Sequence, residues 1–555
     1  MARSLRLLQR TFNKFNESCV RYNSVWTSDG IINSPYEKIK DIPNITLYEY
    51  IWQNLDKWPE RTASICSATG RGYTYEQAFK LSNTFAANLR RKLNIRDGDT
   101  VAVILPNVPD FPLVALGILE AGGVITTVNP IYTAHEIQRQ LLMSDAKVVV
   151  TLPDRVGVVR DALKIAKLNL PIIVVKTNGE SIADGTIAFN ELSEDVHVDK
   201  SCLKEVKRNI NDICFLPYSS GTTGLPKGVE LTHKNIIANC EQINEPKIML
   251  IPPMDTLPEA VLPFFHIYSA SVLMFHKMSQ GIKLVAVPKF QPEAFLHALE
   301  KFKVNILFCA PPIVFLMASH PAANSKTYQY LDIVINGAAP CAASDADRFL
   351  RKIRFGQGYG LTETSPVVCI GAKGCTDYSV VGNAVPSTEL KIVDQDLKAL
   401  GPNQLGELLI RGPQVMKGYR NNPEANAATF SDDWFRSGDV AVADENGVIK
   451  IVDRFKELIK VKGFQVPPAE LEAVLRDHPS VKDAAVIGVP HSSKGEAPKA
   501  FIVLKNDAKA NVKDITSFVN ERVASYKQVN DVVFIDSIPK TASGKILRKE
   551  LKEMN

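Results

Sequence analysis

The sequence predicts an α/β protein with a large amino-terminal domain of two mostly parallel α/β subdomains plus a small β-barrel, followed by a small α+β carboxyl-terminal domain. Short apolar runs alternate with helical periodicity from about residue 98 to residue 359, as in βαβ units. Beyond Gly382 the pattern changes to short alternating strands with Gly and Pro turns, and a compact mixed pattern follows Asp453. The chain has 555 residues, which is too long for a single hydrophobic core.

The predicted elements follow in chain order. The first alternation predicts strands at 100–105, 124–128 and 147–151 and helices at 111–121 and 134–143. The second predicts strands at 213–218, 304–309 and 331–336, separated by helices such as 292–302. The later elements are strands at 389–393, 406–411 and 448–452, a helix at 468–476, strands at 484–489 and 500–504, and a helix at 512–524. Ligand sites of parallel sheets lie at the carboxyl ends of the strands, so we expect the functional site there.

The composition excludes several classes of protein. It is 45% hydrophobic and 23% charged, which is ordinary for a globular chain and excludes a disordered protein or a disulfide scaffold. A net charge of +5 gives no reason to expect a nucleic-acid partner. The nine cysteines form no CxxC pair and the nine histidines no HExxH pattern, so we expect reduced, buried thiols and no structural zinc. No apolar run is long enough to predict a transmembrane segment.

The first residues are basic and amphipathic. Residues 1–23 contain five arginines and lysines but one acid, Glu17, and apolar residues recur three or four positions apart. This pattern predicts a mitochondrial transit segment within residues 1–40 and a matrix location. A basic surface helix or a disordered tail, in a cytoplasmic protein, is the alternative.

A loop rich in glycine, serine and threonine follows the strand expected at 213–218. Small and hydroxyl-bearing residues let backbone amides approach phosphate oxygens, and Lys227 adds a positive charge. The loop is not a Walker A motif, because Pro226 precedes the lysine and Gly228 follows it. The candidate phosphate-binding residues are Ser219, Ser220, Gly221, Thr222, Thr223, Gly224 and Lys227. A simple tight turn is the alternative.

This loop is one of eight segments that occur in the order of a known family. The segments span 218–229, 263–268, 336–340, 357–363, 406–412, 434–439, 453–465 and 543–548. Together they resemble the adenylate-forming superfamily, which includes acyl-CoA synthetases, 4-coumarate–CoA ligases, beetle luciferases and peptide-synthetase adenylation domains. The Phe-His-Ile-Tyr and Lys-Gly-Phe-Gln-Val sequences most resemble the 4-coumarate–CoA ligase branch.

The resemblance implies an acid–CoA ligase that uses ATP, Mg²⁺ and coenzyme A and passes through an acyl-adenylate. It also implies an AMP-binding domain at 41–453, with its barrel at about 380–452, and a mobile carboxyl-terminal domain at 454–555. A mitochondrial address favours a medium- or long-chain fatty acid as substrate, and 4-coumarate or another aryl acid is the alternative. A luciferase-like oxygenase or a non-catalytic binding relative fits less well. The oligomeric state is not predicted.

The resemblance also implies roles for individual residues. The implied catalytic residues are Lys545, His266 and Lys460. Besides the loop, the implied ATP- or AMP-binding residues are Gly337, Ala338, Gln357, Gly358, Tyr359, Thr362, Asp439, Arg454 and Lys456. The acid would contact His266, Tyr268 and Ala339. Coenzyme A would contact Lys289, Lys462 and Gly463. Asp453 would be the hinge between the domains, and Glu363 would bind the metal.

Each of these residues also has a structural interpretation. Without the resemblance, Lys545 is a solvated lysine of a basic run, Glu363 an acid at a helix start and His266 a core residue between apolar neighbours. The walls of the acid pocket are expected at 264–269, 311–315 and 337–341.

Overall fold

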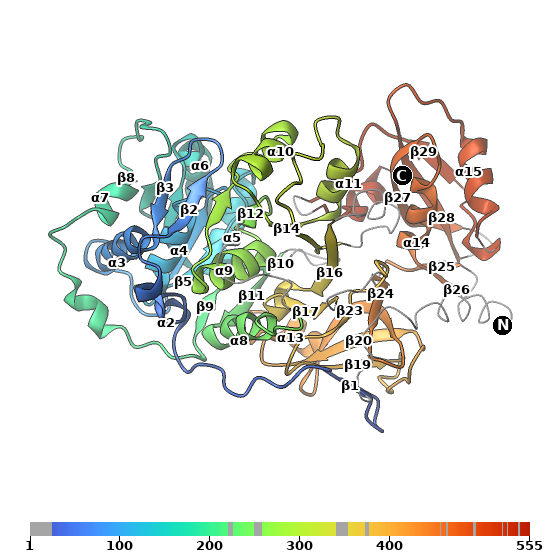
Figure 1. The fold of residues 1–555 in the computed structure, drawn as a ribbon, viewed down its shortest axis with the longest axis horizontal. Coiled ribbons are helices and arrows are strands. Elements are labelled where there is room, and N and C mark those ends of the chain that lie inside the picture. The colour runs from blue at the N-terminus through green and yellow to red at the C-terminus, as the bar shows by residue number, and fades with distance from the viewer. Residues whose placement is uncertain are drawn as a thin grey trace.

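The computed structural model describes residues 25–219, 226–248, 258–339, 353–371, 377–454, 457–461, 464–491, 495–523, 525–529, 531–541 and 544–554. Its strands form two nine-stranded sheets, one six-stranded sheet and one five-stranded sheet. Figure 1 shows the two large sheets on one side, the six-stranded sheet below them and the carboxyl-terminal domain at the far end. The fold class predicted from the sequence is confirmed.

The first large sheet has the order β10-β11-β9-β5-β4-β6-β7-β8, with β21 added to β11. Its strands are β4 (Thr100–Ile104), β5 (Val124–Thr127), β6 (Ala146–Thr151), β7 (Ile172–Val174), β8 (Ile187–Ala188), β9 (Ile213–Phe215), β10 (Tyr218–Ser219), β11 (Lys227–Thr232) and β21 (Gly418–Tyr419). Its helices are α3 (Tyr75–Arg91), α4 (Phe111–Glu120), α5 (Ala134–Ser144), α6 (Val156–Ala166), α7 (Phe189–Ser193) and α8 (His233–Ile243). Strands β4 to β8 pair in parallel, as the alternating pattern predicts.

The second large sheet has the order β18-β17-β16-β15-β14-β12-β13-β2-β3. Its strands are β2 (Thr62–Cys66), β3 (Gly72–Thr74), β12 (Pro258–Ala260), β13 (Leu284–Ala286), β14 (Ile306–Cys309), β15 (Ile333–Asn336), β16 (Arg354–Gly360), β17 (Val367–Ile370) and β18 (Asn383–Ala384). Its helices are α2 (Leu47–Trp52), α9 (His276–Ser279), α10 (Pro292–Lys301) and α11 (Pro311–Ser319), and a π-helical segment η5 (Tyr268–Phe275) leads into α9. Strands β2, β13, β12, β14, β15 and β16 pair in parallel.

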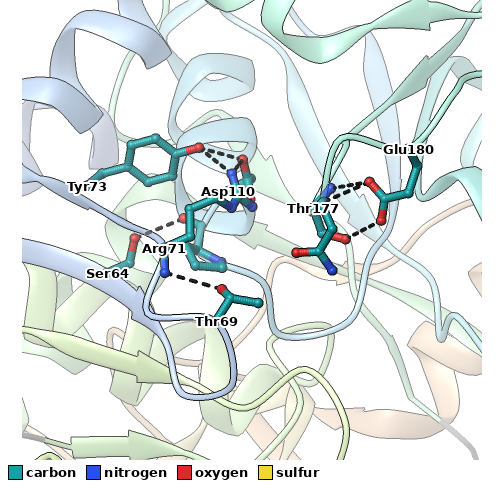
Figure 2. A network of polar contacts seen from close by, with 9 residues as sticks. Ser64, Thr69, Arg71, Tyr73, Asp110, Thr177 and Glu180 are labelled. Carbon is teal, nitrogen blue, oxygen red and sulfur yellow. Dashed lines mark hydrogen bonds and ion pairs between the residues drawn. The ribbon is translucent and has the colours of Figure 1, made fainter.

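Figure 2 shows how the hairpin of β2 and β3 is fixed to the start of α4, which follows a strand of the other large sheet. The Tyr73 hydroxyl donates a 2.8 Å hydrogen bond to Oδ1 of Asp110, the residue before α4. Arg71 forms an ion pair with the same carboxylate, which is buried. The Ser64 hydroxyl adds a 2.9 Å bond to the Pro109 carbonyl. Charge-assisted bonds of this kind resist separation of the two sheets more than neutral bonds do.

The third sheet lies in the part of the chain for which the sequence predicts a small β-barrel. It is antiparallel, with the order β1-β19-β20-β23-β22, and β24 pairs with β23. Its elements are β1 (Ile31–Asn33), β19 (Glu389–Val393), β20 (Gly406–Arg411), α13 (Pro423–Thr429), β22 (Phe430–Ser431), β23 (Trp434–Ala443) and β24 (Ile449–Arg454). Its strands β19, β20, β22, β23 and β24 lie within residues 389–454, where the sequence predicts the small barrel of alternating strands.

The start of the described chain belongs to this third sheet. Val25 and Ile32 are buried in the main core, and the Trp26 indole N–H donates a 2.9 Å bond to the Asp444 carbonyl. In Figure 1 the strand β1 lies beside β19. The predicted transit segment within residues 1–40 would include this strand, and its boundary stays a prediction. Residues 1–24 lie outside the described residues, and the prediction of a mitochondrial address stays a prediction.

The carboxyl-terminal domain has a five-stranded sheet and its own core. Its strands are β25 (Ile459–Val461), β26 (Phe464–Val466), β27 (Val481–His491), β28 (Gly495–Leu504) and β29 (Asp531–Phe534). Its helices are α14 (Pro468–Arg476), α15 (Val512–Asn520) and α16 (Arg548–Glu553). Apolar residues of α14, β27, β28 and α15 form a cluster separate from that of the large domain.

Two expectations drawn from composition also concern the described part of the chain. The six cysteines found there are buried and form no disulfide with one another, as expected for reduced thiols. Among the same residues, no helix is long and apolar enough to cross a membrane.

Candidate active site

The main cavity has a volume of about 950 Å³ and is lined by the two large sheets, the third sheet and the carboxyl-terminal domain. Its walls include the carboxyl ends of β15 and β16, as expected for a ligand site of a parallel sheet. The volume is at the upper end of the range for small-molecule sites. The cavity is therefore large enough for a nucleotide and a second small molecule together.

Lys545 enters this cavity from the carboxyl-terminal domain. It lies on a tight turn in which the Thr541 amide donates a 2.8 Å bond to the Lys545 carbonyl and the Lys545 amide donates a 3.1 Å bond to the Thr541 hydroxyl. The turn passes through Gly544 at a φ of +81°, which favours glycine. A Cβ atom on Gly544 would lie 2.9 Å from Pro312 at the start of α11. Burial and the neighbouring Arg454 lower the pKa of Lys545.

A second cluster joins β16, β23 and β24. The Tyr359 hydroxyl donates a 2.5 Å hydrogen bond to Oδ2 of Asp439, and Arg454 Nε lies 2.7 Å from Oδ1. Tyr359 and Arg454 line the cavity, whereas Asp439 lies behind them and is buried. Burial raises the pKa of Asp439, although Arg454 stabilises its charged form. The cluster fixes an aromatic ring and a cation at the cavity wall.

A third cluster surrounds Glu363. The carboxylate accepts a 2.8 Å hydrogen bond from the Tyr419 hydroxyl at Oε1, and Glu363 itself lines the cavity. The Lys227 ammonium lies 4.8 Å from the centre of the Tyr419 ring. Tyr419 therefore contacts both the cation of the phosphate loop and the acid expected to bind metal. Mg²⁺ in phosphate sites usually binds one or two carboxylates and the phosphates of the substrate, and Glu363 fits that pattern.

His266 and Tyr268 line the cavity on the side of η5. Burial and the charge of Lys545 lower the pKa of His266 to about 4, so its imidazole is neutral at neutral pH. The Tyr268 hydroxyl donates a 3.2 Å bond to the Ile335 carbonyl, and its ring covers Gly337. A Cβ on Gly337 would lie 2.9 Å from that ring, which explains a glycine at this position. The two side chains provide neutral polar groups beside an apolar wall.

Comparison with known proteins identifies the family. The AMP-binding enzyme family matches residues 51–420, and the AMP-binding enzyme C-terminal domain matches residues 470–545. The chain belongs to the AMP-binding enzyme family. It is 38% identical over 529 residues to 4-coumarate–CoA ligase 1 of Petroselinum crispum, covering 93% of this chain and 95% of that protein. A benzoate–CoA ligase from Burkholderia xenovorans LB400 has a TM-score of 0.81 at 26% identity, covering 91% and 99% of the two chains.

This AMP-binding enzyme is also similar to MatB from Rhodopseudomonas palustris, which has been solved with and without ATP. Both comparisons cover 92% of this chain and 99% of MatB at 26% identity. The TM-score is 0.82 with the ATP-bound form but 0.71 with the apo form. The overall arrangement of this AMP-binding enzyme is therefore closer to that of ATP-bound MatB. The relatives are CoA ligases, and the chain is accordingly an acid–thiol ligase that uses ATP and coenzyme A.

The structure brings most of the described candidate residues of this AMP-binding enzyme together. Those that line the cavity are Ser219, Lys227, His266, Tyr268, Gly337, Ala338, Gly358, Tyr359, Thr362, Glu363, Arg454 and Lys545. Eight further candidates lie outside the described residues: Ser220, Gly221, Thr222, Thr223, Gly224, Lys456, Lys462 and Gly463. The remaining candidates lie away from the cavity wall and are described next.

Gln357 and Ala339 support the wall from behind. The Asn336 side-chain amide donates 3.1 Å bonds to the Gln357 side-chain oxygen and to the Ala339 carbonyl. Neither Gln357 nor Ala339 lines the cavity, so they would act on a bound molecule only through neighbouring residues.

Two lysines expected near coenzyme A or the acid also lie outside the wall. Lys289 is exposed after β13. Lys460 is exposed on β25, and its amide donates a 2.7 Å bond to Glu496.

Asp453, the expected hinge, ties the end of β24 to the first turn of α14. Its Oδ2 accepts a 3.0 Å bond from the Ala469 amide, and its Oδ1 accepts a 2.7 Å bond from the Arg454 amide. Burial raises the pKa of Asp453 to about 6, although Arg548 opposes this effect. Arg548 in turn forms ion pairs with Glu457 at 3.0 Å and Glu472 at 2.7 Å. The residue at the domain boundary is therefore enclosed by charged groups of the carboxyl-terminal domain.

Several residues of the site were not predicted from the sequence. Residues 311–315 do not line the cavity, because the start of α11 packs against Gly544 instead. Tyr419, His276 and Lys277 line the cavity and were not predicted. Tyr419 follows the segment at 406–412 in an ordinary strand and gives no local indication of its contact with Glu363. His276 and Lys277 continue the helix that begins at Tyr268, and that continuity is the indication that was available.

Proposed function

We propose that the cavity carries out the adenylation step of an acid–CoA ligase. A carboxylate oxygen of the acid attacks the α-phosphorus of ATP, an O–P bond forms to give an acyl-adenylate, and the bond to pyrophosphate breaks. Two anions must approach one another in this step, so positioning and positive charge dominate the barrier. The observation that carries the proposal is the Lys545 ammonium in one cavity with Lys227, Glu363 and Arg454.

Each group has a distinct proposed role. Lys545 bridges the acid carboxylate and the α-phosphate, and Lys227 neutralises the outer phosphates. The ring of Tyr359 covers the adenine, and Asp439 and Arg454 hold the ribose side of the nucleotide. Neutral His266 orients the acid without adding a charge that would compete with Lys545.

Glu363 is proposed to hold Mg²⁺ together with the phosphates of ATP. The ion supplies charge neutralisation to the phosphates when it is bound. Among the described residues no group of three His, Cys, Asp or Glu side chains forms a metal site, and phosphate oxygens of ATP would supply further ligands. The hydrogen bond from Tyr419 holds one carboxylate oxygen, which leaves the other oxygen for the ion.

Thioester formation is proposed to follow a rotation of the carboxyl-terminal domain about Asp453. The sulfur of coenzyme A attacks the acyl carbon, a C–S bond forms, and AMP leaves with the electron pair of the C–O bond. Lys545 occupies the cavity in this structure while Lys460 is exposed elsewhere on the same domain. One compact domain presents these two lysines on different faces, so a change of orientation is the simplest way to bring Lys460 to the acid.

For the acid, the proposal favours an aryl acid. The similarity to 4-coumarate–CoA ligases supports this class. The side of the cavity along η5 and α9 also ends in His276 and Lys277, which suits a compact acid better than an unbroken hydrocarbon chain. A medium- or long-chain fatty acid is the second candidate, supported by the basic, amphipathic first residues.

Two half-reaction assays test the proposal. Acid-dependent exchange of pyrophosphate into ATP measures adenylation, and conversion of supplied acyl-AMP plus coenzyme A measures thioester formation. Lys545→Ala should lower exchange by roughly 10²-fold, the scale for loss of one well-placed stabilising group. The variant should retain the second half-reaction. Equal loss of both activities, or exchange that does not depend on any acid, would contradict the proposed function.

A further inference from the structure

A buried lysine lines the cavity on the side away from the carboxyl-terminal domain. Lys277 lies in α9, directly after η5, and only 1% of its surface is exposed. It nevertheless belongs to the cavity wall. Figure 1 shows α9 among the elements of the large domain, away from the carboxyl-terminal domain that supplies Lys545. The cavity is therefore lined by lysines of both domains, Lys277 from the large domain and Lys545 from the carboxyl-terminal domain.

Nothing in the described structure satisfies this ammonium. Among the described residues, no hydrogen bond or ion pair to its Nζ is found, and the nearest aromatic partner is the ring of Phe308 at 5.6 Å. Burial lowers the pKa of Lys277 to about 7. A lysine is rarely buried without a partner, because removing its charge from water is costly and a hydrophobic residue would pack there at no such cost. The position is therefore difficult to explain by stability alone.

The neighbouring residue adds a second polar atom without a partner. Nε2 of His276 lies 2.8 Å from the side-chain oxygen of Asn244, whereas its buried Nδ1 has no hydrogen-bond partner within the described part of the chain. His276 also lines the cavity. Two adjacent residues thus present unsatisfied polar atoms at the same end of the cavity, where the rest of the wall includes Val272 and Phe308.

The ring of Phe308 is a neighbour both of Lys277 and of Tyr268, the residue expected beside the acid carboxylate. The Phe308 ring lies 6.4 Å from the ring of Tyr268, which is expected beside the acid carboxylate, and 5.6 Å from the Lys277 ammonium. An acid whose carboxylate lies near His266 and Tyr268 would therefore extend along Phe308 toward Lys277.

We propose that Lys277 determines substrate specificity by donating a hydrogen bond to a second oxygen group at the far end of the acid. The inference rests on the proposed acid–CoA ligase function and specifies its substrate class. The oxygen group is a carboxylate or a phenolic hydroxyl, since both accept a hydrogen bond from an ammonium. An acid that ends in a methyl group or an unsubstituted ring would leave the buried lysine unsatisfied, and such sites discriminate strongly against the analogue without the polar group.

Two pairs of acids test the proposal, because each pair differs only at the far end. Octanedioate is compared with octanoate, and 4-coumarate is compared with cinnamate. The readout is the ratio of kcat/KM within each pair, measured by acid-dependent pyrophosphate exchange. The wild-type enzyme should prefer the oxygen-bearing member of at least one pair. Lys277→Met should reduce that preference by about 10- to 100-fold, the scale for a hydrogen bond to a charged group.

Two further variants separate specificity from folding. Lys277→Gln keeps a donor of similar length without the charge, and it should reduce the preference for the dicarboxylate more than the preference for the phenol. Lys283→Met changes another partly buried lysine that does not line the cavity, and it should leave both ratios unchanged. Stabilisation of each variant by ATP in a thermal-shift measurement shows that its nucleotide site is folded.

The outcomes distinguish this inference from the function on which it rests. If the wild-type enzyme prefers neither oxygen-bearing acid, or if Lys277→Met and Lys277→Gln leave both ratios unchanged, Lys277 has no role in specificity. If no acid of the panel supports exchange, the proposed function is overturned together with the inference. A reduced ratio in both Lys277 variants, with normal ratios in Lys283→Met, supports the proposal.

Discussion

A Cβ atom on Gly544 would lie 2.9 Å from Cδ of Pro312, so the loop that carries Lys545 rests against the first turn of α11 without space for a side chain. This contact joins the carboxyl-terminal domain to the large domain beside the reacting atoms. It also occurs at a φ of +81°, which an alanine adopts only with strain.

Gly544→Ala should therefore displace Lys545 from the cavity. We expect acid-dependent pyrophosphate exchange to fall by roughly 10²-fold, because a displacement of about 1 Å costs that much in a positioned site. Conversion of supplied acyl-AMP to thioester should remain. Gly179→Ala is a matched control, since Gly179 has a φ of +65° and nothing within 4 Å of its Cβ position. If the two variants lose exchange equally, backbone strain and not the contact with Pro312 is responsible.

The metal proposal gives a second prediction. Glu363→Gln should raise the Mg²⁺ concentration needed for half-maximal exchange and lower the maximal rate, because a carboxamide is a weaker ligand than a carboxylate. Tyr419→Phe should raise the same Mg²⁺ requirement by about tenfold, the scale for loss of a residue that orients a ligand. Titration of Mg²⁺ at saturating ATP measures both effects.

Tyr218→Phe provides the control for this titration. The Tyr218 hydroxyl is buried beside the cavity and has no hydrogen-bond partner among the described residues, so its removal should leave the Mg²⁺ requirement unchanged. A normal Mg²⁺ requirement in Glu363→Gln, with a lowered unfolding temperature, would instead indicate a purely structural acid.

Alternation of the two half-reactions predicts opposite effects at two lysines. Lys460→Ala should leave pyrophosphate exchange within a few-fold of the wild-type rate and reduce thioester formation from supplied acyl-AMP by roughly 10²-fold. Lys545→Ala should show the reverse pattern. Lys482→Ala, at another exposed lysine of the same domain, should affect neither step. Loss of both steps in Lys460→Ala would favour a single fixed site over rotation.

The buried lysine also predicts a dependence of stability on pH. The pKa of Lys277 is about 7 in the folded chain and near 10.5 in the unfolded chain. The unfolded chain therefore binds more protons between these two values, and the contribution of Lys277 to stability rises with pH across that window. Cys240 on α8 and His276 face the same region and are neutral there, because burial raises the pKa of the thiol and lowers that of the imidazole.

Lys277→Met removes this titration. At pH 7 and below, the variant should be more stable than the wild type by about 1 kcal/mol or more, because the unpaired charge is gone. The difference should shrink as the pH rises toward 10. Denaturant unfolding of both proteins at pH 6.5, 8 and 9.5 measures it, and a difference that does not change with pH would show that Lys277 has a partner in solution.

The targeting prediction can now be tested with a sharper boundary. Residues 1–24 contain the basic amphipathic pattern, whereas β1 begins at Ile31 and belongs to the folded domain. A reporter fused to residues 1–24 should enter mitochondria as well as one fused to residues 1–40. Changing Arg3, Arg6 and Arg10 to Glu should abolish import. A diffuse cytosolic signal from both fusions would contradict the prediction.

The site could be predicted from sequence where its residues lie in contiguous segments. Lys545, Glu363 and His266 each stand within a short segment that resembles a segment of the adenylate-forming superfamily, and all three line the cavity. Tyr419 was not found, because its hydrogen bond to Glu363 joins residues that are 56 positions apart. Pairing across such a distance depends on how the third sheet packs against the large domain.

The same limit applies to the fold. Buried parallel strands such as β4 and β6 are continuous apolar runs and were predicted within one residue at each end. The three-residue strand β1 was missed, because its only identifying feature is its pairing with β19. Lys277 was missed for a different reason: it follows an apolar helical run, and the sequence alone does not show that its ammonium is buried without a partner.

Neighbouring residues of β24 connect two different parts of this enzyme. Arg454 contacts Asp439 at the proposed nucleotide site, while the carboxylate of Asp453 accepts a hydrogen bond from the backbone of α14. Successive residues of a strand point to opposite faces, so the two contacts share one short piece of backbone. A small rotation of that backbone segment would displace both side chains at once and in opposite directions. Release of the nucleotide product and reorientation of the carboxyl-terminal domain would then occur together.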